Sequence, residues 1–145
     1  MIAIGSDHGG FELKEIIKKH LEKRNIEYKD FGTFSEASVD YPAYGIAVGE
    51  AVASGECEKG ILVCGTGIGI SMAANKVKGV RAACCSDTFS ARFTRMHNDA
   101  NVICMGGRVV GPGLALDIVD LFLDTEFEGG RHQKRIDLIT EYENK

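Results

Sequence analysis

One short segment combines a residue suited to proton abstraction with backbone suited to holding a negative charge. Residues 60–64 form an apolar run that ends in Cys64, and glycines follow at alternate positions, Gly65, Gly67 and Gly69. A helical pattern begins directly afterwards, so free N–H groups and the positive end of a helix dipole favour a thiolate there. Amides without a side chain let a small anion approach closely. The segment predicts a base or nucleophile beside an anion hole.

The spacing excludes three better-known loops at this place. A cysteine phosphatase needs an arginine six residues after its nucleophile, where this chain has Ile70. A Walker A loop ends in Gly-Lys-Ser/Thr, whereas this loop ends in Gly69, Ile70 and Ser71. The dinucleotide fingerprint would also place its third glycine at Ile70, and it follows the first strand of its fold. A tight turn with a buried, inert cysteine stays open as the alternative.

Length and composition limit the kind of protein to which this loop belongs. The chain has 145 residues, of which 44% are hydrophobic, enough for one domain with a real core. A net charge of −4 gives no general attraction to nucleic acid or to an anionic membrane, so an anionic ligand depends on local basic residues. The apolar runs are too short for a membrane span and the first residues do not resemble a signal peptide, so we expect a cytoplasmic protein.

The cysteines and histidines show no pattern of a disulfide framework or of a metal site. The five cysteines include no Cys-x-x-Cys pair. Those expected in the core are Cys84, Cys85 and Cys104, and Cys57 is expected at the surface or at its boundary. The four histidines lack the spacing of metal ligands, so neither metal nor cofactor is predicted. They are His8, His20, His97 and His132, of which His20 is expected to be exposed.

Apolar runs alternate with helical patterns along the chain, and this alternation predicts the fold. Strands are expected at 2–6, 26–31, 60–64, 80–85 and 101–105. Helices are expected at 10–24, 41–54, 68–76, 87–97, 112–124 and 131–143. Two of the strands lack polar alternation, as parallel strands covered on both faces do. The pattern predicts one domain, residues 1–145, with a three-layer α/β/α sandwich around a doubly wound, five-stranded parallel sheet.

Ligands of such sheets bind beyond the carboxyl ends of the strands, which directs attention to the residues there. Asp7 and His8 follow the first strand and precede two glycines. Arg108 follows the fifth strand after a second glycine pair. Asp7 on its own is more typical of a helix N-cap than of a catalyst, but the adjacent His8 and the two glycines make these side chains candidates for the same site as Cys64.

Two further polar groups lie near helix ends. His97 and Asn98 close the helix before the fifth strand. Arg131 and Arg135 lie four residues apart at the start of the last helix, so they share one face and could hold one phosphate together. The simpler alternatives are a histidine that complements a negative helix end and a solvated basic turn.

Motifs over nearly the whole chain resemble those of one family, the ribose/galactose isomerases, and within it the B-type ribose-5-phosphate isomerases. They are the segments 7–9, 38–42, 64–69, 73–76, 97–101 and 129–135. The resemblance implies a Rossmann-like isomerase that interconverts aldose and ketose phosphates through a cis-enediolate, without metal or cofactor. Some members carry a glutamate further along the loop as the base. Here Ala73 and Ala74 follow the loop, which leaves Cys64 as the evident base.

The resemblance also implies a role for each candidate residue. Cys64 would move a proton between C2 and C1, and His97 would be the general acid that opens the sugar ring. The backbone of the loop would hold the enediolate oxygens, through Gly65, Thr66, Gly67, Ile68 and Gly69. The phosphate would bind to His8, Arg108, Arg131 and Arg135. Sugar hydroxyls would be oriented by Asp7, Tyr41, Thr66 and Asn98.

In this family the active site is shared across a homodimer, so the resemblance implies a dimer, or a tetramer built from dimers. The helix at 131–143 would then reach the partner subunit, with His97, Asn98 and the two arginines in the partner's site. Three alternatives stay open from the sequence. They are an isomerase of allose 6-phosphate, an isomerase of galactose 6-phosphate, and a module that binds a sugar phosphate without chemistry.

Overall fold

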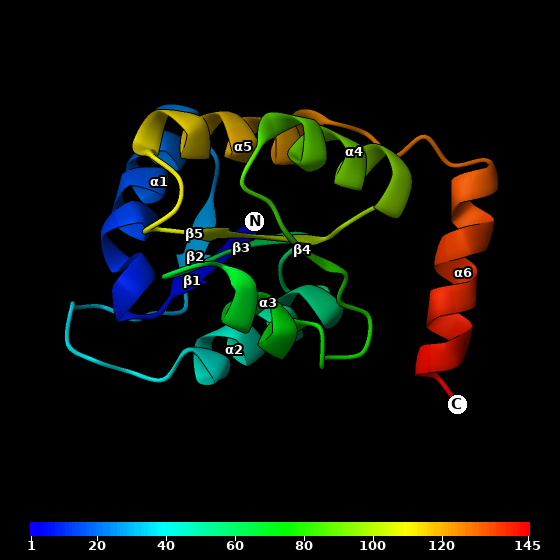
Figure 1. The fold of residues 1–145 in the computed structure, drawn as a ribbon, viewed down its shortest axis with the longest axis horizontal. Coiled ribbons are helices and arrows are strands. Elements are labelled where there is room, and N and C mark those ends of the chain that lie inside the picture. The colour runs from blue at the N-terminus through cyan, green and yellow to red at the C-terminus, as the bar shows by residue number, and fades with distance from the viewer.

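Strands and helices alternate in the computed structural model, which describes residues 1–145 (Figure 1). The strands are β1 (Ile2–Ser6), β2 (Tyr28–Asp30), β3 (Lys59–Cys64), β4 (Ala82–Cys84) and β5 (Val102–Gly106). The helices are α1 (Phe11–Lys23), α2 (Tyr41–Ala53), α3 (Ile68–Ala74), α4 (Thr88–Asn98), α5 (Pro112–Asp124) and α6 (Arg131–Glu143), and a 3-10 turn spans His8–Gly10. Every predicted element is confirmed. None of the helices combines the length and the apolar character that a membrane span needs.

Two strands are shorter than the sequence predicts, and local turns explain why. The Ile26 N–H donates to the Leu21 carbonyl, and the Val80 N–H donates to the Val77 carbonyl. These bonds close the turns before β2 and β4, so both residues are taken up in turns before their strands begin. Both strands lie at the edges of the sheet, where one neighbouring strand is missing.

The sheet is parallel and doubly wound, as predicted, with the strand order β2-β1-β3-β5-β4. The chain runs from β1 out to one edge, returns to β3, and then fills the other edge. The carboxyl ends of β1 and β3 therefore flank the point where the strand order reverses, where ligands of such sheets bind. Helices α1, α4 and α5 cover one face and α2 and α3 the other, while α6 stands apart beside the β4 edge (Figure 1).

The core has two halves, one on each face of the sheet, because successive strand side chains point to opposite faces. Ile61 and Val63 pack under α1 and α5, whereas Leu62 and Cys64 pack toward α2 and α3. The same alternation in β5 places Ile103 on the first face. Cys64 is the last residue of β3 and is only 4% exposed, so the core fixes the direction of its side chain.

Three expectations about single residues are wrong. Cys85 and Cys104 are buried as predicted, but Cys84 is exposed because it lies on the edge strand β4. Cys57 is buried, because the segment after α2 folds back and the Cys57 N–H donates to the Ala51 carbonyl. His20 is half-buried and not simply exposed, since its Nε2 lies 2.8 Å from Asp120 Oδ1 on α5.

A buried ammonium group joins α1 to the chain beyond β2. Lys14 is 0% exposed, and its Nζ donates to both carboxylate oxygens of Asp30, at 2.7 and 2.8 Å, and to the Thr33 carbonyl at 2.6 Å. Lys18 reaches the same carboxylate at 2.9 Å. Burial alone would raise the pKa of Asp30, but the hydrogen bonds from the two lysines and from the Gly32 N–H outweigh it and lower that pKa.

We expect Asp30→Asn to lower the free energy of unfolding by about 3–5 kcal/mol, because it leaves the ammonium of Lys14 buried without its counter-charge. Urea unfolding at neutral pH measures this. Asp124→Asn is the matched control, since it removes an exposed partner of Arg24 and should cost much less.

The ion pair between Lys14 and Asp30 makes the free energy of unfolding depend on pH. The pKa of Asp30 is lower in the folded state than in the unfolded chain, so its contribution is present above the unfolded pKa of about 3.9 and is lost as pH falls through the folded value. The difference between wild type and Asp30→Asn should shrink in acid. A difference that is the same at pH 7 and in strong acid would contradict the assigned ion pair.

Candidate active site

The loop after β3 brings a backbone N–H onto the sulfur of Cys64. The Gly67 N–H donates to Cys64 Sγ at 3.1 Å, and both atoms are buried. Gly67 has φ +81°, in the left-handed region, and a Cβ there would lie 2.7 Å from the Met105 carbonyl carbon. A side chain is therefore excluded by conformation and by space. This turn lets α3 begin at Ile68 directly beside the thiol.

Tyr41 packs against the other end of the same loop. A Cβ at Gly69 would lie 2.6 Å from Cζ of the Tyr41 ring, so the phenol lies directly on the backbone of α3. Within the loop, Thr66 Oγ1 accepts a hydrogen bond from the Ile68 N–H at 3.2 Å. The exposed thiol of Cys84 lies 3.8 Å from the Thr66 carbonyl. The loop thus gathers the predicted residues from 64 to 69 and Tyr41 into one place.

The residues after β1 form the neighbouring wall. Asp7 is the N-cap of the 3-10 turn, because its Oδ1 accepts a hydrogen bond from the Gly10 N–H at 3.1 Å, which confirms the simpler alternative for this residue. His8 Nδ1 accepts a hydrogen bond from the Val39 N–H at 3.1 Å. An Nδ1 that accepts carries no proton, so the donor of His8 is its Nε2.

Arg108 completes this half of the site from the turn after β5. A Cβ at Gly65 would lie 3.3 Å from Arg108 Nη1, so the guanidinium lies against the backbone of the Cys64 loop. His8 and Arg108 line one cavity of about 370 Å³, together with the acidic side chains of Glu12 and Glu36. Two of the four predicted phosphate ligands therefore share a cavity, and one of them, Arg108, lies against the backbone of the Cys64 loop.

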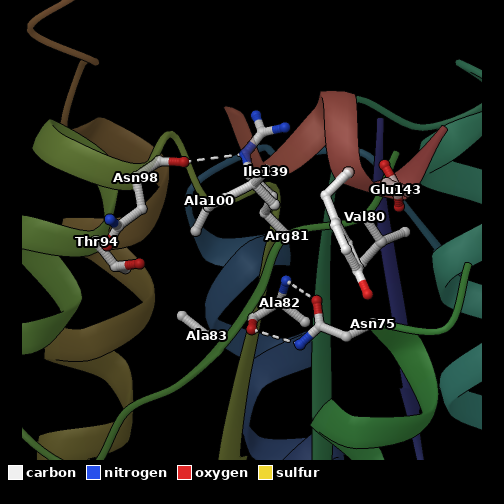
Figure 2. Close-up of a pocket in the computed structure, with 11 residues that line it drawn as sticks. Asn75, Val80, Arg81, Ala82, Ala83, Thr94, Asn98, Ala100, Ile139 and Glu143 are labelled. Carbon is white, nitrogen blue, oxygen red and sulfur yellow. Dashed lines mark hydrogen bonds between the residues drawn. The ribbon is translucent and has the colours of Figure 1, made fainter. Parts of the chain in front are cut away.

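The other predicted residues lie in a second group. His97 and Asn98 end α4, and Asn98 lines a separate cavity of about 520 Å³ between β4 and α6 (Figure 2). Arg81 lies in the same cavity, where its Nε donates to the Asn98 carbonyl at 3.0 Å. Arg131 and Arg135 are exposed at the start of α6. The cavity that holds Asn98 has no lining residue in common with the cavity of His8 and Arg108.

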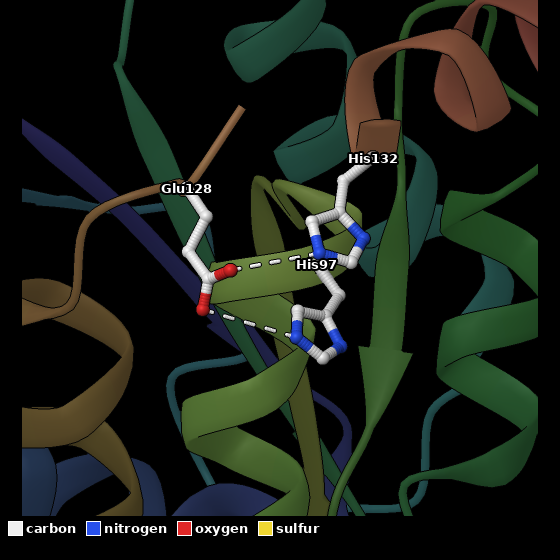
Figure 3. A group of neighbouring side chains, drawn as sticks. All are labelled: His97, Glu128 and His132. Atoms are coloured by element: carbon white, nitrogen blue, oxygen red, sulfur yellow. Dashed lines mark ion pairs between the residues drawn. The ribbon is translucent and has the colours of Figure 1, made fainter. Parts of the chain in front are cut away.

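Around His97 the structure assembles a cluster that sequence analysis missed. The ring of His97 stacks on the ring of His132, with centroids 4.1 Å apart. It also packs at a steep angle against the ring of Phe93, with centroids 5.0 Å apart. Glu128 faces both histidines (Figure 3). Burial lowers the pKa of His132, and the neighbouring His97 and Arg131 add to this. The histidines show no metal-ligand spacing in the sequence, but the fold brings two of them to a glutamate here.

The structure is that of an α/β domain with a group of polar side chains at the carboxyl ends of its parallel strands. Comparison with known proteins defines it further. The family model Ribose/Galactose Isomerase matches residues 2–139. The chain is 53% identical to ribose-5-phosphate isomerase B of Escherichia coli, over 99% of this chain and 97% of that protein. The chain belongs to the ribose/galactose isomerase family, and it is an isomerase.

Solved structures agree with this assignment. Ribose-5-phosphate isomerase B of Clostridium thermocellum has a TM-score of 0.98 and 58% identity, covering 99% of this chain and 97% of that one. The enzyme of Mycoplasma genitalium, solved with bound ribulose 5-phosphate, has a TM-score of 0.95 and 45% identity, covering 99% and 96%. The similarity therefore extends over the whole fold, including both groups of candidate residues.

We expect Gly67→Ala to lower kcat by about 100-fold, because the loop must move away from Met105 and carry its N–H away from the thiol. Gly79→Ala is the control. Gly79 has a similar φ of +91°, but a Cβ there would be 3.7 Å from its nearest neighbour, Ala53 Cβ. Steady-state kinetics of the two purified variants measures the difference. Equal activity in both would contradict the role of the Gly67 turn.

Proposed function

We propose that this isomerase interconverts ribose 5-phosphate and ribulose 5-phosphate through a cis-enediolate, with Cys64 as the base. The observation that carries this assignment is the hydrogen bond from the Gly67 N–H to Cys64 Sγ at 3.1 Å, which holds the sulfur against the glycine loop. Cys64 lies at the carboxyl end of β3, and Arg108, which lines the cavity where a phosphate would be held, lies against the backbone of the next residue, Gly65.

In the proposed reaction the thiolate takes the proton from C2 of the open-chain aldose. The electron pair of that C–H bond forms the C1–C2 double bond, and the negative charge moves to the aldehyde oxygen. A proton passes from the C2 hydroxyl to that oxygen, and Cys64 then returns its proton to C1, which gives the ketose. The amides of this loop other than those of Gly67 and Ile68, which already donate to Cys64 Sγ and Thr66 Oγ1, would stabilise the oxygens of the enediolate.

The proposed phosphate site begins with His8 and Arg108. Because His8 Nδ1 is occupied by the Val39 N–H, its Nε2–H is free to donate into the cavity. Arg108 adds a fixed positive charge with a planar set of donors that suits a phosphate. Asp7, Tyr41 and Thr66, which surround the same edge, would orient the sugar hydroxyls.

We further propose that the second group, His97, Asn98, Arg131 and Arg135, completes the site of a partner subunit in a homodimer. Within one chain, the cavity that Asn98 lines is separate from the cavity of His8 and Arg108, which supports a shared site in a dimer. Helix α6 also exposes large apolar side chains, with Leu138 57%, Ile139 60% and Tyr142 75% exposed, which a partner would cover. In the dimer His97 would open the furanose ring of a sugar bound by the other chain.

Five free thiols, one of them exposed at Cys84, suit a reducing compartment. We therefore propose the cytoplasm as the place of this reaction. A coupled assay of ribulose 5-phosphate formation from ribose 5-phosphate tests the activity itself. Absence of product with the purified wild type would contradict the proposed substrate.

Cys64→Ser should lower kcat by about 100-fold or more while substrate still binds, because a hydroxyl is far too weak an acid to replace the thiolate. The coupled assay gives kcat, and calorimetry with ribose 5-phosphate gives the affinity. Cys84→Ser is the control, since it changes a thiol near the same loop and should keep wild-type turnover. Near-normal turnover by Cys64→Ser would remove Cys64 from the mechanism.

Mixed dimers test the shared site. If each site takes Cys64 from one subunit and His97 from the other, Cys64→Ser and His97→Ala are inactive alone, but a mixed dimer has one intact site. Random pairing makes about half of the dimers mixed, so co-refolding should recover roughly a quarter of wild-type activity. Persistent inactivity, with mixed dimers confirmed by mass spectrometry, would assign both residues to one subunit's site.

A further inference from the structure

The cluster of His97, Glu128 and His132 presents three potential metal ligands from three parts of the chain. His97 is on α4, His132 is in the first turn of α6, and Glu128 lies in the segment that precedes α6. Their ligating atoms all lie within 4.8 Å of one another. The segment is fixed by its backbone, since the Glu128 N–H donates to the Met96 carbonyl at 3.1 Å and the His132 N–H to the Gly129 carbonyl at 3.2 Å.

The distances in this cluster are too long for direct hydrogen bonds. His132 Nε2 lies 3.5 Å from Glu128 Oε2, and His97 Nε2 lies 3.9 Å from Oε1, whereas an N–H···O bond spans about 2.7–3.2 Å. Two ligand atoms that share a tetrahedral ion, each about 2.0–2.2 Å from it, lie roughly 3.3–3.5 Å apart. Each of these two nitrogen–oxygen distances, which reach different oxygens of Glu128, is therefore closer to that between ligands of one cation than to that of a hydrogen bond.

We propose that His97, Glu128 and His132 form a site for Zn²⁺. Two imidazole nitrogens and one carboxylate are a donor set that suits zinc and that magnesium or calcium does not favour. Both Nε2 atoms face the carboxylate (Figure 3). His132 is buried and fixed, while His97 and Glu128 are partly exposed and leave a fourth position open to water. The His97 and His132 rings are stacked with an interplanar angle of 13°, so the His97 ring must turn out of the stack for both nitrogens to bind one ion.

This site has a consequence that rests on the proposed function of His97. A nitrogen bound to zinc cannot donate a proton to the oxygen of a sugar ring, so the metal would inhibit the enzyme and not activate it. The ion would also occupy the lone pair of the His97 imidazole, which in the proposed dimer faces the sugar bound by the partner subunit. Zinc and the ring-closed substrate should therefore compete.

Binding is tested first, without reference to activity, on the chelator-treated full chain titrated with Zn²⁺ in a calorimeter. We expect one ion per chain and a loss of affinity of about tenfold or more in both Glu128→Gln and His132→Gln. Glu126→Gln, an exposed glutamate two residues away, is the matched control and should bind as the wild type does. Far-ultraviolet circular dichroism of each variant confirms its fold, and Glu128→Gln changes only an exposed side chain.

Thiols also bind zinc, so the ligands are identified with Co²⁺ as a second probe. A site of two histidines and a carboxylate gives only weak visible bands, whereas a thiolate adds an intense charge-transfer band in the near ultraviolet. Unchanged affinity in Glu128→Gln and His132→Gln, or a charge-transfer band that disappears in Cys84→Ser, would overturn the proposal.

The effect on turnover separates this inference from the proposed function. Zinc should slow the conversion of ribose 5-phosphate by the wild type and leave Glu128→Gln much less affected. If zinc binds at the cluster but turnover does not change, the metal site stands and the role of His97 in ring opening fails.

Discussion

The hydrogen bond from the Gly67 N–H to Cys64 Sγ is the interaction on which the rest of the site depends. It exists because β3 lies in the middle of the sheet, between β1 and β5, and ends in a residue whose side chain the core already directs. The turn that supplies the N–H lies directly on the Met105 backbone of β5. The position of the thiol is therefore set by the packing of three strands and not by the loop alone.

In the proposed phosphate site, His8 depends for its orientation on contacts elsewhere in the chain. His8 is oriented by the Val39 N–H, which belongs to the long connection after β2. The start of that connection is tied to α1 through Lys14, Asp30 and Thr33. The buried ammonium of Lys14 thus stabilises the connection that orients His8. The net charge of −4 gives no hint of this local arrangement.

Strongly patterned features could be predicted from the sequence, and features that depend on tertiary contacts could not. The apolar run before Cys64 and the glycines after it predict the β3–α3 turn, because the periodicity of a strand and the conformation of glycine are local properties. The exposure of Cys84 and the burial of Cys57 depend on which strand is at the edge and on how a loop folds back, and the sequence carries no signal for either.

The cluster around His97 shows the same limit at the site itself. Glu128 and His132 are four residues apart and could have been recognised as a pair. His97 joins them only because α4 ends beside the first turn of α6. Likewise, Lys14 looks like an ordinary surface lysine of an amphipathic helix until Asp30 is placed beside it. The roles proposed for Arg131 and Arg135 would depend on a second subunit, which the sequence does not reveal.

Selective alkylation tests the central claim, that the loop turns one nearly buried thiol into the base. The enzyme is treated with limiting iodoacetamide, and peptide mass spectrometry gives the occupancy of each cysteine while the same samples are assayed. Cys64 is 4% exposed and Cys84 is exposed, so access alone favours Cys84. The account predicts that activity falls in proportion to carboxamidomethylation of Cys64 and that ribose 5-phosphate protects Cys64. Loss of activity that follows modification of Cys84, with Cys64 still free, would contradict it.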